Sequence, residues 1–333
     1  MSINCYAALG AKKPLEKFQY EPKELGPSDV EVAISHCGLC YSDVHLVDDD
    51  LGISAYPLVP GHEIIGTVTV VGSNVGSYSE GQRVGVGVQV GSCMACEACL
   101  RGEQTCCPEL QGIGLGVYGG FAETIRVDSR FAYPIPEGLD SENAAPLLCG
   151  GATVFSPLHQ YVKPTMRVGV IGIGGLGHLA LQYANAFGCE VTAFSSTPAK
   201  EEEARTLGAH HFIVTGNSDG LEKAANSLDF ILFTSHAELD WTAFLNILRP
   251  RGKLCFVGFP PGAIGIPGFP LIFGQKSVVG SLIGDCSTNI EMLRFSAQHG
   301  IKAQTELLPM TEINQAFDKL RENRVRYRMV LNN

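Results

Sequence analysis

The sequence lacks the features of membrane, secreted and nucleic-acid-binding proteins. It has no run of about 18 or more apolar residues, the length that a transmembrane helix requires. Its first residues do not show the charged and then apolar layout of a secretory signal peptide. Positive charge is scarce, because 24 lysines and arginines stand against 34 aspartates and glutamates, for a net charge of −10. We therefore expect a cytoplasmic protein that binds neither nucleic acid nor a membrane.

Cysteine, by contrast, is abundant, with 12 residues in a chain of 333. Without an export signal, these cysteines argue against a disulfide scaffold and favour metal binding or catalysis. The length suggests two domains. The sequence shows no internal repeat, low-complexity tract or flexible linker. We therefore expect packed segments to join the two domains.

The residue pattern changes near Lys163 and Pro164. Before this point the chain is dense in glycine and has the pattern of short strands, as at residues 30–34 and 67–71. After it, strand-like and helix-like segments alternate, which is typical of a parallel doubly wound α/β sheet. The expected strands span residues 167–171, 190–194, 211–214, 228–233, 254–257 and 277–282, and the expected helices span residues 176–187, 198–207, 221–227, 240–248, 290–299 and 312–323.

A G-x-G-x-x-G motif runs from Gly172 to Gly177, between an apolar strand and an amphipathic helix. In such a motif Gly172 permits a tight turn, Gly174 lets the backbone approach a diphosphate, and Gly177 lets the helix pack closely on the strand. Gly175 and Leu176 complete the loop, and the N-terminus of the following helix favours anions. We therefore predict a dinucleotide site here. The alternative is a glycine-rich turn without a ligand.

Neither aspartate nor glutamate occurs in residues 191–200, which cover most of the second strand of this region and the residues directly after it. In an NAD site, a carboxylate about 20 residues after the glycines binds the ribose 2′-hydroxyl. This segment instead offers Ser195, Ser196, Thr197 and Lys200, whose hydroxyl and ammonium groups suit a 2′-phosphate. The pattern favours NADP(H). Ser195 and Thr197 can also cap the helix that follows.

Four closely spaced cysteines, Cys93, Cys96, Cys99 and Cys107, follow the pattern C-x2-C-x2-C-x7-C. Cysteines so close in one loop can surround a tetrahedral ion, and four thiolates leave no coordination position for a substrate. We predict a structural zinc site. Cys106 competes with its neighbour for the fourth position, and the spacing favours Cys107. The alternative is a cluster of free or redox-active thiols.

Five motifs, in the order in which they occur, resemble those of the zinc-dependent medium-chain alcohol dehydrogenases, most closely the cinnamyl alcohol dehydrogenase-like branch. They are GLCYSDVH, GHE, the four-cysteine loop, APLLCGGATV and GIGGLG. The resemblance extends over nearly the whole chain. It implies an α/β protein with a GroES-like, mostly β catalytic domain at residues 1–148, completed by about residues 289–333. Residues 149–288 would form a Rossmann domain with a doubly wound parallel sheet.

The resemblance also implies a catalytic zinc, so that each chain would hold two zinc ions. Cys40, His62 and Cys149 would be its ligands, with a fourth position open to water or substrate. Two thiolates and one imidazole are a known catalytic ligand set. Glu63 would lie near the metal as an exchangeable ligand. Asp43 would accept a hydrogen bond from His62 and fix its tautomer.

Further roles are implied for residues near these ligands. Ser42 would contact the substrate oxygen, and His45 would end a proton relay through the cofactor ribose. The alternatives are a turn serine and a histidine on a helix face. Five other residues resemble segments that contact the cofactor in the family: Thr153, Val257, Ser281, Ile283 and Arg328.

The chain departs from the family pattern at two places. Tyr41 stands where the branch usually has a histidine near the cofactor diphosphate, so cofactor affinity or product release can differ. Residues 108–118 replace a longer loop that helps to form the substrate entrance in relatives. The preference for a particular substrate therefore carries over poorly.

The resemblance implies reversible hydride transfer between NADP(H) and a primary alcohol or aldehyde, aromatic or aliphatic. Three alternatives remain: a polyol dehydrogenase, a zinc-free quinone or enone reductase on the same fold, and a non-catalytic dinucleotide-binding redox sensor. Relatives form homodimers through the cofactor domain. The apolar residues 269–273 and 278–282 are candidates for such an interface, or for core.

Overall fold

The computed structural model describes residues 2–333, which form two compact units. Unit 1 is formed by the chain up to Cys149 together with Gly284–Asn333, and unit 2 is formed by Gly150–Ile283. Each unit contains its own sheet and its own hydrophobic core. Among the described residues, no helix has both the length and the apolar character needed to cross a bilayer.

Unit 1 is built on a mostly antiparallel sheet with the strand order β10-β5-β4-β3-β18-β17, and β9 also pairs with β3. Only β17 and β18 are parallel neighbours in this sheet. Two further small sheets, β1-β2 and β6-β7-β8, belong to the same unit. The strands are β1 (Ile3–Ala8), β2 (Leu15–Tyr20), β3 (Asp29–Leu39), β4 (Glu63–Val71), β5 (Arg83–Val86), β6 (Gln89–Gly91), β7 (Gln111–Ile113), β8 (Gly116–Val117), β9 (Thr124–Asp128), β10 (Ala132–Pro134), β17 (Thr305–Pro309) and β18 (Arg328–Asn332).

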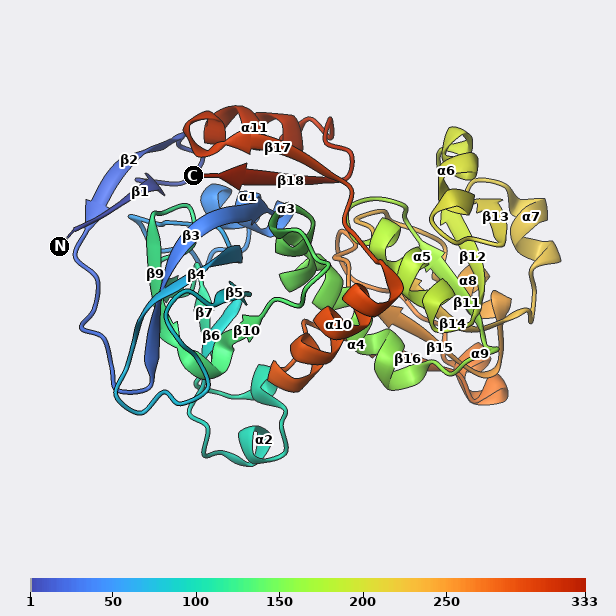
Figure 1. Cartoon of the computed structure of the whole chain (residues 1–333). Coiled ribbons are helices and arrows are strands. Elements are labelled where there is room, and N and C mark those ends of the chain that lie inside the picture. Colours follow the sequence, from blue (N-terminus) through green and yellow to red (C-terminus); the bar gives the residue numbers. More distant parts are fainter. Residues whose placement is uncertain (1) are drawn as a thin grey trace. The chain divides into compact units, whose positions relative to one another are not determined.

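The helices of unit 1 connect these strands. They are α1 (Tyr41–Asp48), α2 (Glu97–Leu100), α3 (Ser141–Ala144), α10 (Cys286–His299) and α11 (Ile313–Arg321), with short 3-10 turns that include η1 (Gln104–Cys106) and η3 (Ala145–Leu148). Figure 1 shows α11 lying along β17 and β18. The C-terminal segment thus returns to the first part of the chain and completes its sheet.

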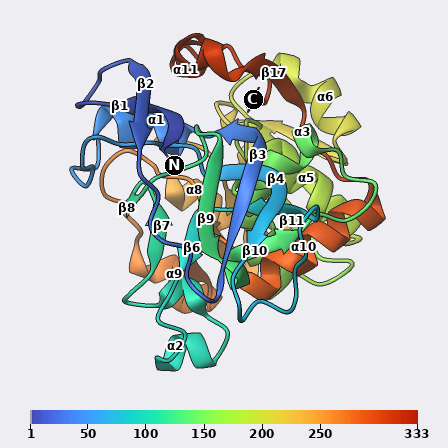
Figure 2. The same ribbon diagram turned by 60° about the vertical axis from the view of Figure 1, so that its left-hand side comes forward.

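Strand β3 organises the core of unit 1. Val30, Val32 and Ile34 are buried at every second position, the spacing that places side chains on one face of a sheet. They belong to one apolar cluster with residues of β4, β9 and β18. Figure 2 shows β3, β4 and β9 running side by side.

The register of three strands brings distant residues to one end of this sheet. Gly38 of β3 pairs with Glu63 of β4, and Leu39 of β3 pairs with Met329 of β18. Residues just beyond these pairs, such as Cys40 and Arg328, are therefore neighbours although they lie far apart in sequence. Because register is set by the buried face of each strand, the core fixes this meeting point.

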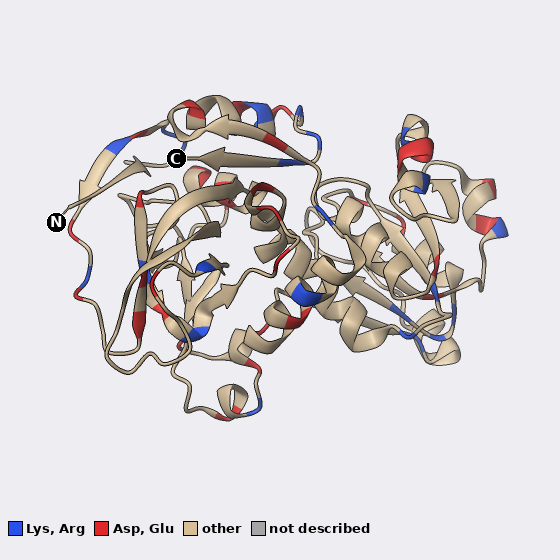
Figure 3. Ribbon diagram, in the orientation of Figure 1, with Lys and Arg blue, Asp and Glu red and all other residues tan. Residues whose placement is uncertain are grey.

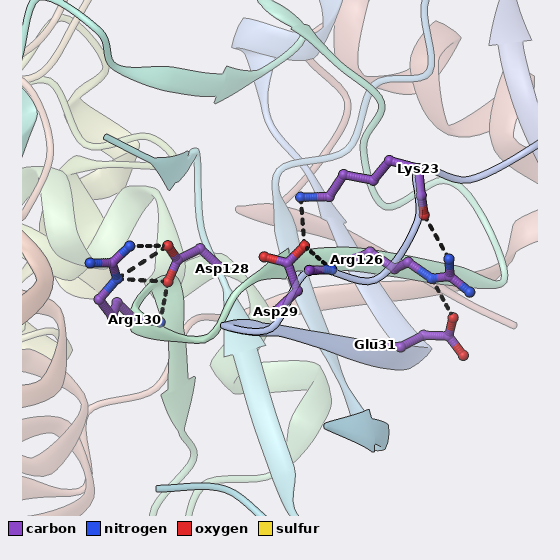
Figure 4. Close-up of polar contacts among 7 residues, drawn as sticks. Lys23, Asp29, Glu31, Arg126, Asp128 and Arg130 are labelled. Carbon is purple, nitrogen blue, oxygen red and sulfur yellow. Dashed lines mark hydrogen bonds and ion pairs between the residues drawn. The ribbon is translucent and has the colours of Figure 1, made fainter. Parts of the chain in front are cut away.

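Ion pairs hold the other end of β3 to its neighbours (Figure 4). Arg126 of β9 lies opposite Glu31 in the antiparallel register, and its Nε donates to Glu31 Oε2 at 2.7 Å. Arg126 also donates to the carbonyl oxygen of Lys23, whose Nζ lies 2.9 Å from Asp29. These contacts anchor the segment before β3, and pairs with one exposed partner add little stability.

Unit 2 is a parallel sheet with the strand order β13-β12-β11-β14-β15-β16. Numbered from the first strand of the unit, this order is 3-2-1-4-5-6, that of a Rossmann fold. The expected α/β fold class, with a doubly wound parallel sheet in this unit, is thereby confirmed. The strands are β11 (Arg167–Ile171), β12 (Glu190–Ser195), β13 (His211–Val214), β14 (Leu228–Phe233), β15 (Leu248–Phe256) and β16 (Ser277–Gly280).

The helices of unit 2 follow the expected alternation, but one is displaced and two, at residues 150–161 and 268–274, were not predicted. They are α4 (Gly150–Tyr161), α5 (Gly177–Ala186), α6 (Glu201–Thr206), α7 (Ser218–Lys223), α8 (Trp241–Ile247) and α9 (Gly268–Gly274). The helix predicted at residues 221–227 is wrong in position, because Asn217 caps the N–H of Gly220 and starts α7 earlier. Figure 3 shows acidic and basic residues together on α6.

Candidate functional site

A buried cluster of four potential metal ligands lies in unit 1 at the end of the β3–β4 pair. Its members are Cys40, His62, Glu63 and Cys149, and their ligand atoms lie within 4.8 Å of one another. The two sulfur atoms are 4.0 Å apart. Two thiolates on one tetrahedral zinc ion would be about 3.8 Å apart, given the usual Zn–S distance. The fold thus brings together three predicted ligands that spacing alone could not connect.

Two buried atoms of this cluster have no hydrogen-bond partner within the described residues, His62 Nε2 and Glu63 Oε2. An unpaired buried polar atom is costly, and a metal ion would satisfy both. On the other side of the ring, His62 Nδ1 lies 2.9 Å from Asp43 Oδ1. This contact assigns the proton to Nδ1 and leaves the lone pair of Nε2 for a metal. The residues therefore fit a zinc ion.

Asp43 fixes the two chain segments that carry the first ligands. It is fully buried in the first turn of α1. Its Oδ2 accepts the N–H of Cys40 at 3.0 Å, and its Oδ1 accepts the N–H of Gly61 at 2.8 Å in addition to the contact with His62. One carboxylate therefore orients both the start of α1 and the turn before β4.

The surroundings of Cys40 favour its thiolate form. Cys149 Sγ donates toward Cys40 Sγ, and this hydrogen bond holds the pKa of Cys40 well below its usual range. The positive charge of Arg328 acts in the same direction. The thiolate is the form of cysteine that binds zinc.

Glu63 is the member of the metal cluster that contacts the C-terminal strand β18. Arg328 of β18 is buried, and its guanidinium donates to Glu63 Oε1. Burial raises the pKa of Glu63 to about 8, although the Arg328 charge opposes this. A Cβ atom at Gly38 would lie only 2.0 Å from Glu63 Oε2, so glycine is required there. Arg328 is thus placed at the metal cluster, and its contact with a cofactor stays a prediction.

Ser42 and His45 lie on α1, directly after Cys40. Ser42 Oγ is 3.6 Å from Cys40 Sγ. His45 is partly exposed, its Nδ1 lies 3.1 Å from Asp50 Oδ2, and its ring packs edge-on against Tyr41 at 4.9 Å between centroids. The residue patterns did not predict a role for Asp50. Its signal is the acidic run 48–50 at the C-terminal end of α1, where Asp49 turns the chain back with a φ of 54°.

The second cysteine cluster lies in one loop of unit 1. The sulfur atoms of Cys93, Cys96, Cys99 and Cys107 lie within 4.8 Å of one another. Cys93 Sγ is 3.5 Å from Cys107 Sγ and 3.9 Å from Cys99 Sγ. Backbone N–H groups lower the pKa of Cys93 to about 7. Cys106 is exposed and outside the cluster. Four sulfur ligands fit a closed zinc site that holds the loop together.

The glycine-rich loop of unit 2 runs from β11 into α5 and has space for a phosphate. Gly172 has a φ of 90°, which favours glycine. A Cβ atom at Gly177 would lie 1.8 Å from the carbonyl oxygen of Gly172. At Gly174, in contrast, a Cβ atom would meet nothing within 4 Å. The loop, which also contains Gly175 and Leu176, therefore fits the diphosphate of a dinucleotide.

The end of β12 carries hydroxyl groups and one ammonium group. Ser195 is buried, and its Oγ accepts the N–H of Thr197 at 3.1 Å, whereas Ser196 is exposed. Lys200 Nζ donates to the carbonyl oxygen of Ile173 at 2.6 Å, which places the ammonium group beside the glycine-rich loop. This donor set, without a carboxylate, fits a ribose 2′-phosphate.

Four further predicted cofactor residues belong to unit 2. Val257 directly follows β15, and Ser281 and Ile283 follow β16, so they lie beyond the carboxyl ends of parallel strands. Ligands of open α/β sheets bind at this edge. Thr153 is buried in the first turn of α4. Their contacts with a cofactor stay predictions.

Two family models match the chain. Residues 26–137 match the alcohol dehydrogenase GroES-like domain, and residues 175–298 match the zinc-binding dehydrogenase. The first covers His62 and the four-cysteine loop, and the second covers most of the parallel sheet. The matches thus include both units.

Individual proteins resemble the chain over its full length. Aldehyde reductase AdhA of Synechocystis sp. is 42% identical over 99% of this chain and 98% of its own. A cinnamyl alcohol dehydrogenase structure from Sorghum bicolor has a TM-score of 0.95 and 38% identity, covering 100% of this chain and 98% of its own. The Helicobacter pylori cinnamyl alcohol dehydrogenase complexed with NADP(H) has a TM-score of 0.91 and 32% identity, with the same coverage.

Proposed function

This chain belongs to the zinc-dependent medium-chain alcohol dehydrogenases, in their cinnamyl alcohol dehydrogenase-like branch, and we propose that it interconverts primary alcohols and aldehydes with NADP(H). Its substrates are aromatic aldehydes such as cinnamaldehyde, or aliphatic aldehydes, and the reaction runs in both directions. The name of the Synechocystis relative, an aldehyde reductase, supports this substrate class. The use of NADP(H) supports reduction as the main direction in the cell.

The buried cluster of Cys40, His62, Glu63 and Cys149 carries this proposal. Its donor set has two thiols, an imidazole and an exchangeable carboxylate, and His62 Nε2 lacks any other partner within the described residues. Three firm ligands with a replaceable fourth are characteristic of catalytic zinc sites. A zinc ion bound there would supply a Lewis acid, and NADP(H) would donate or accept the hydride.

Residues of α1 and of the turn after it are placed to transfer the proton that aldehyde reduction consumes. Ser42, beside the sulfur of Cys40, holds a hydroxyl proton next to the metal cluster. His45 is partly exposed and can exchange a proton with water. Asp50 bonds to His45 Nδ1 and fixes the orientation of the ring. In this proposal Ser42 and His45 are the two ends of a proton relay that the cofactor ribose connects.

The preference for NADP(H) over NAD(H) rests on the end of β12. Ser195, Ser196, Thr197 and Lys200 offer hydroxyl groups and a positive charge, and residues 191–200 contain no carboxylate that would repel a phosphate. The relative from Helicobacter pylori was crystallised with NADP(H). Both observations support the same cofactor.

We further propose that the enzyme is a cytoplasmic homodimer with two zinc ions per chain. Support for the dimer comes from α9, where Phe269, Ile272 and Phe273 are 68%, 75% and 76% exposed. Large apolar side chains gathered on a surface mark contact sites. The nearby strand β16 is an edge strand of the parallel sheet. The second zinc ion would be bound by the closed cluster, the four thiols of Cys93, Cys96, Cys99 and Cys107.

A substrate panel tests the proposal. The protein is mixed with NADPH or NADH and with cinnamaldehyde, benzaldehyde or hexanal, and the loss of nicotinamide absorbance is recorded; mannitol with NADP⁺ tests the polyol alternative. We expect turnover of aldehydes with NADPH and loss of turnover in Cys40→Ala. No turnover with any aldehyde, or full activity of the variant, would contradict the proposal. A preference for NADH would contradict the choice of cofactor alone.

A further inference from the structure

One hydroxyl group contacts two neighbouring carbonyl groups where β11 enters the glycine-rich loop. Thr234, which follows β14, places its Oγ1 at 2.9 Å from the carbonyl oxygen of Ile171 and at 2.8 Å from that of Gly172. Its single proton is shared between the two acceptors. The same oxygen lies 3.1 Å from the position that a Cβ atom of Gly177 would occupy. Thr234 thus fits closely under the turn.

Two further side chains bind the next two carbonyl groups. Lys200 Nζ donates to the carbonyl oxygen of Ile173 at 2.6 Å, and His178 Nδ1 lies 3.1 Å from that of Gly174. His178 is fully buried in the first turn of α5. Because a carbonyl oxygen only accepts, Nδ1 carries the proton in this contact. Four consecutive carbonyl groups, from the end of β11 into the loop, therefore accept hydrogen bonds from side chains of three separate segments. The first and last of them also accept the backbone N–H groups of Thr234 and His178.

The N–H groups of the loop show the complementary pattern. Gly172 N–H donates to Phe194 on the neighbouring strand. Those of Ile173, Gly174 and Gly175 donate to no acceptor among the described residues. The side chains thus bind the acceptors of this segment and leave its donors to a ligand. Successive free N–H groups at a helix N-terminus bind anions.

We propose that Thr234 and His178 are positioning residues for the cofactor diphosphate. With Lys200, they hold the loop in the conformation whose free N–H groups bind phosphate oxygens. A glycine-rich loop has much conformational freedom to lose on binding, and a loop fixed in advance binds more tightly. In the proposed function Lys200 also binds the 2′-phosphate, so its ammonium group would contact both this loop and that phosphate. The inference rests on the proposed function, in which the loop binds NADP(H).

Two fragments of the cofactor separate these contributions. ADP-ribose contains the diphosphate but no 2′-phosphate, and adenosine 2′-monophosphate contains the 2′-phosphate but no diphosphate. Dissociation constants of both are measured by calorimetry on the full-length, zinc-loaded protein. The variants are Thr234→Val, which removes the hydroxyl at constant size, and Thr234→Ser, which restores it. Thr206→Val is the control, because this hydroxyl also binds a backbone carbonyl, that of Glu202 on the exposed face of α6.

Thr234→Val is expected to raise the Kd of ADP-ribose about five- to tenfold, the effect of one hydrogen bond, and to change that of adenosine 2′-monophosphate less than about twofold. Thr234→Ser and Thr206→Val should bind both fragments like the wild type. His178→Leu should behave like Thr234→Val, and His178→Asn, which keeps a donor, should recover affinity. Lys200→Met should weaken both fragments.

Unchanged ADP-ribose affinity in Thr234→Val, or an equal loss for both fragments, would overturn the inference. So would a failure of Thr234→Ser to restore binding, because the methyl group would then be the important part. The proposed function fails separately: if the wild type binds ADP-ribose but not adenosine 2′-monophosphate, the cofactor is NAD(H), and the effect of Thr234 on the diphosphate can still be measured.

Discussion

The two cysteine clusters of unit 1 differ in how the chain builds them. The four thiols of the closed cluster come from a single loop, residues 93–107, and two of them are partly exposed. The open cluster combines residues 40, 62, 63 and 149, all buried, with three kinds of donor. The closed cluster is local, and the open cluster exists only when the sheet is folded.

This difference determines how far each cluster depends on the rest of the fold. Residues of one loop can bind zinc with little help from the rest of the fold, and the metal then stabilises the loop. The open cluster needs the β3–β4 and β3–β18 registers, the turn at Gly61 and the support of Asp43. We expect changes at the open cluster to affect catalysis, and changes at the closed cluster to affect stability.

The largest effect is expected for Cys40→Ala. Loss of this thiolate removes a firm ligand of the open cluster, so kcat/KM for aldehyde reduction should fall by about 10³-fold or more. The melting temperature should change little, because the closed cluster is intact. Steady-state kinetics and calorimetry measure the two quantities. A large loss of stability with normal residual activity would reverse the roles assigned to the clusters.

Cys99→Ala should show the opposite pattern. Loss of one of four thiolates weakens the closed zinc site, and the melting temperature should fall by about 10 °C. At low temperature kcat/KM should stay within about tenfold of the wild type, because the sites are separate. Cys106→Ser is the matched control, since this exposed thiol lies outside the cluster. An equal effect of both changes would contradict the ligand assignment.

Asp43→Asn tests the support of the open cluster. The amide cannot accept the hydrogen bonds of Cys40, Gly61 and His62 together in the same way, so zinc affinity at this site should fall about 10- to 100-fold. Competition with a chromogenic chelator measures it. Asp50→Asn is the control, because the carboxylate of Asp50 contacts His45 and not a metal ligand. This variant should keep the zinc affinity of the wild type.

The smallest effect is expected for Gly38→Ala. The new methyl group would collide with Glu63 Oε2, and displacement of this carboxylate should lower the free energy of unfolding by about 1–3 kcal/mol. Urea denaturation measures the change. Gly76→Ala is the control, because a Cβ atom there meets nothing within 4 Å, and we expect a change below about 1 kcal/mol. Equal stability of both variants would remove the packing argument for Gly38.

Much of unit 2 could be predicted from the sequence, because its signals are local. Strands 167–171, 211–214 and 228–233 have the predicted bounds, since each is a short, predominantly apolar segment between turn residues. The helix predicted at residues 221–227 lies at residues 218–223 instead, because the side chain of Asn217 caps its N-terminus. In unit 1, the spacing of the cysteines likewise predicted which four thiols form the closed cluster. Such features depend on neighbours in sequence.

The open cluster was accessible from the sequence only through resemblance. No local pattern connects Cys40 with Cys149, because they meet only where η3, which directly precedes Cys149, packs on β3 and β4. The contact of Asp50 with His45 depends on the left-handed conformation of Asp49, and the contact of Arg328 with Glu63 depends on the pairing of β18 with β3. Side-chain contacts across strands or turns need the folded backbone, and the sequence alone contains no signal of their distance.

The division of roles between the two clusters is tested most directly by the zinc content and turnover of one variant. Native mass spectrometry of Cys40→Ala, followed by NADPH-dependent aldehyde reduction on the same sample, measures both. We predict one zinc ion per chain, retained by the closed cluster, and no detectable turnover. One zinc ion per chain together with wild-type turnover would contradict the account, because the open cluster would then not be the catalytic centre.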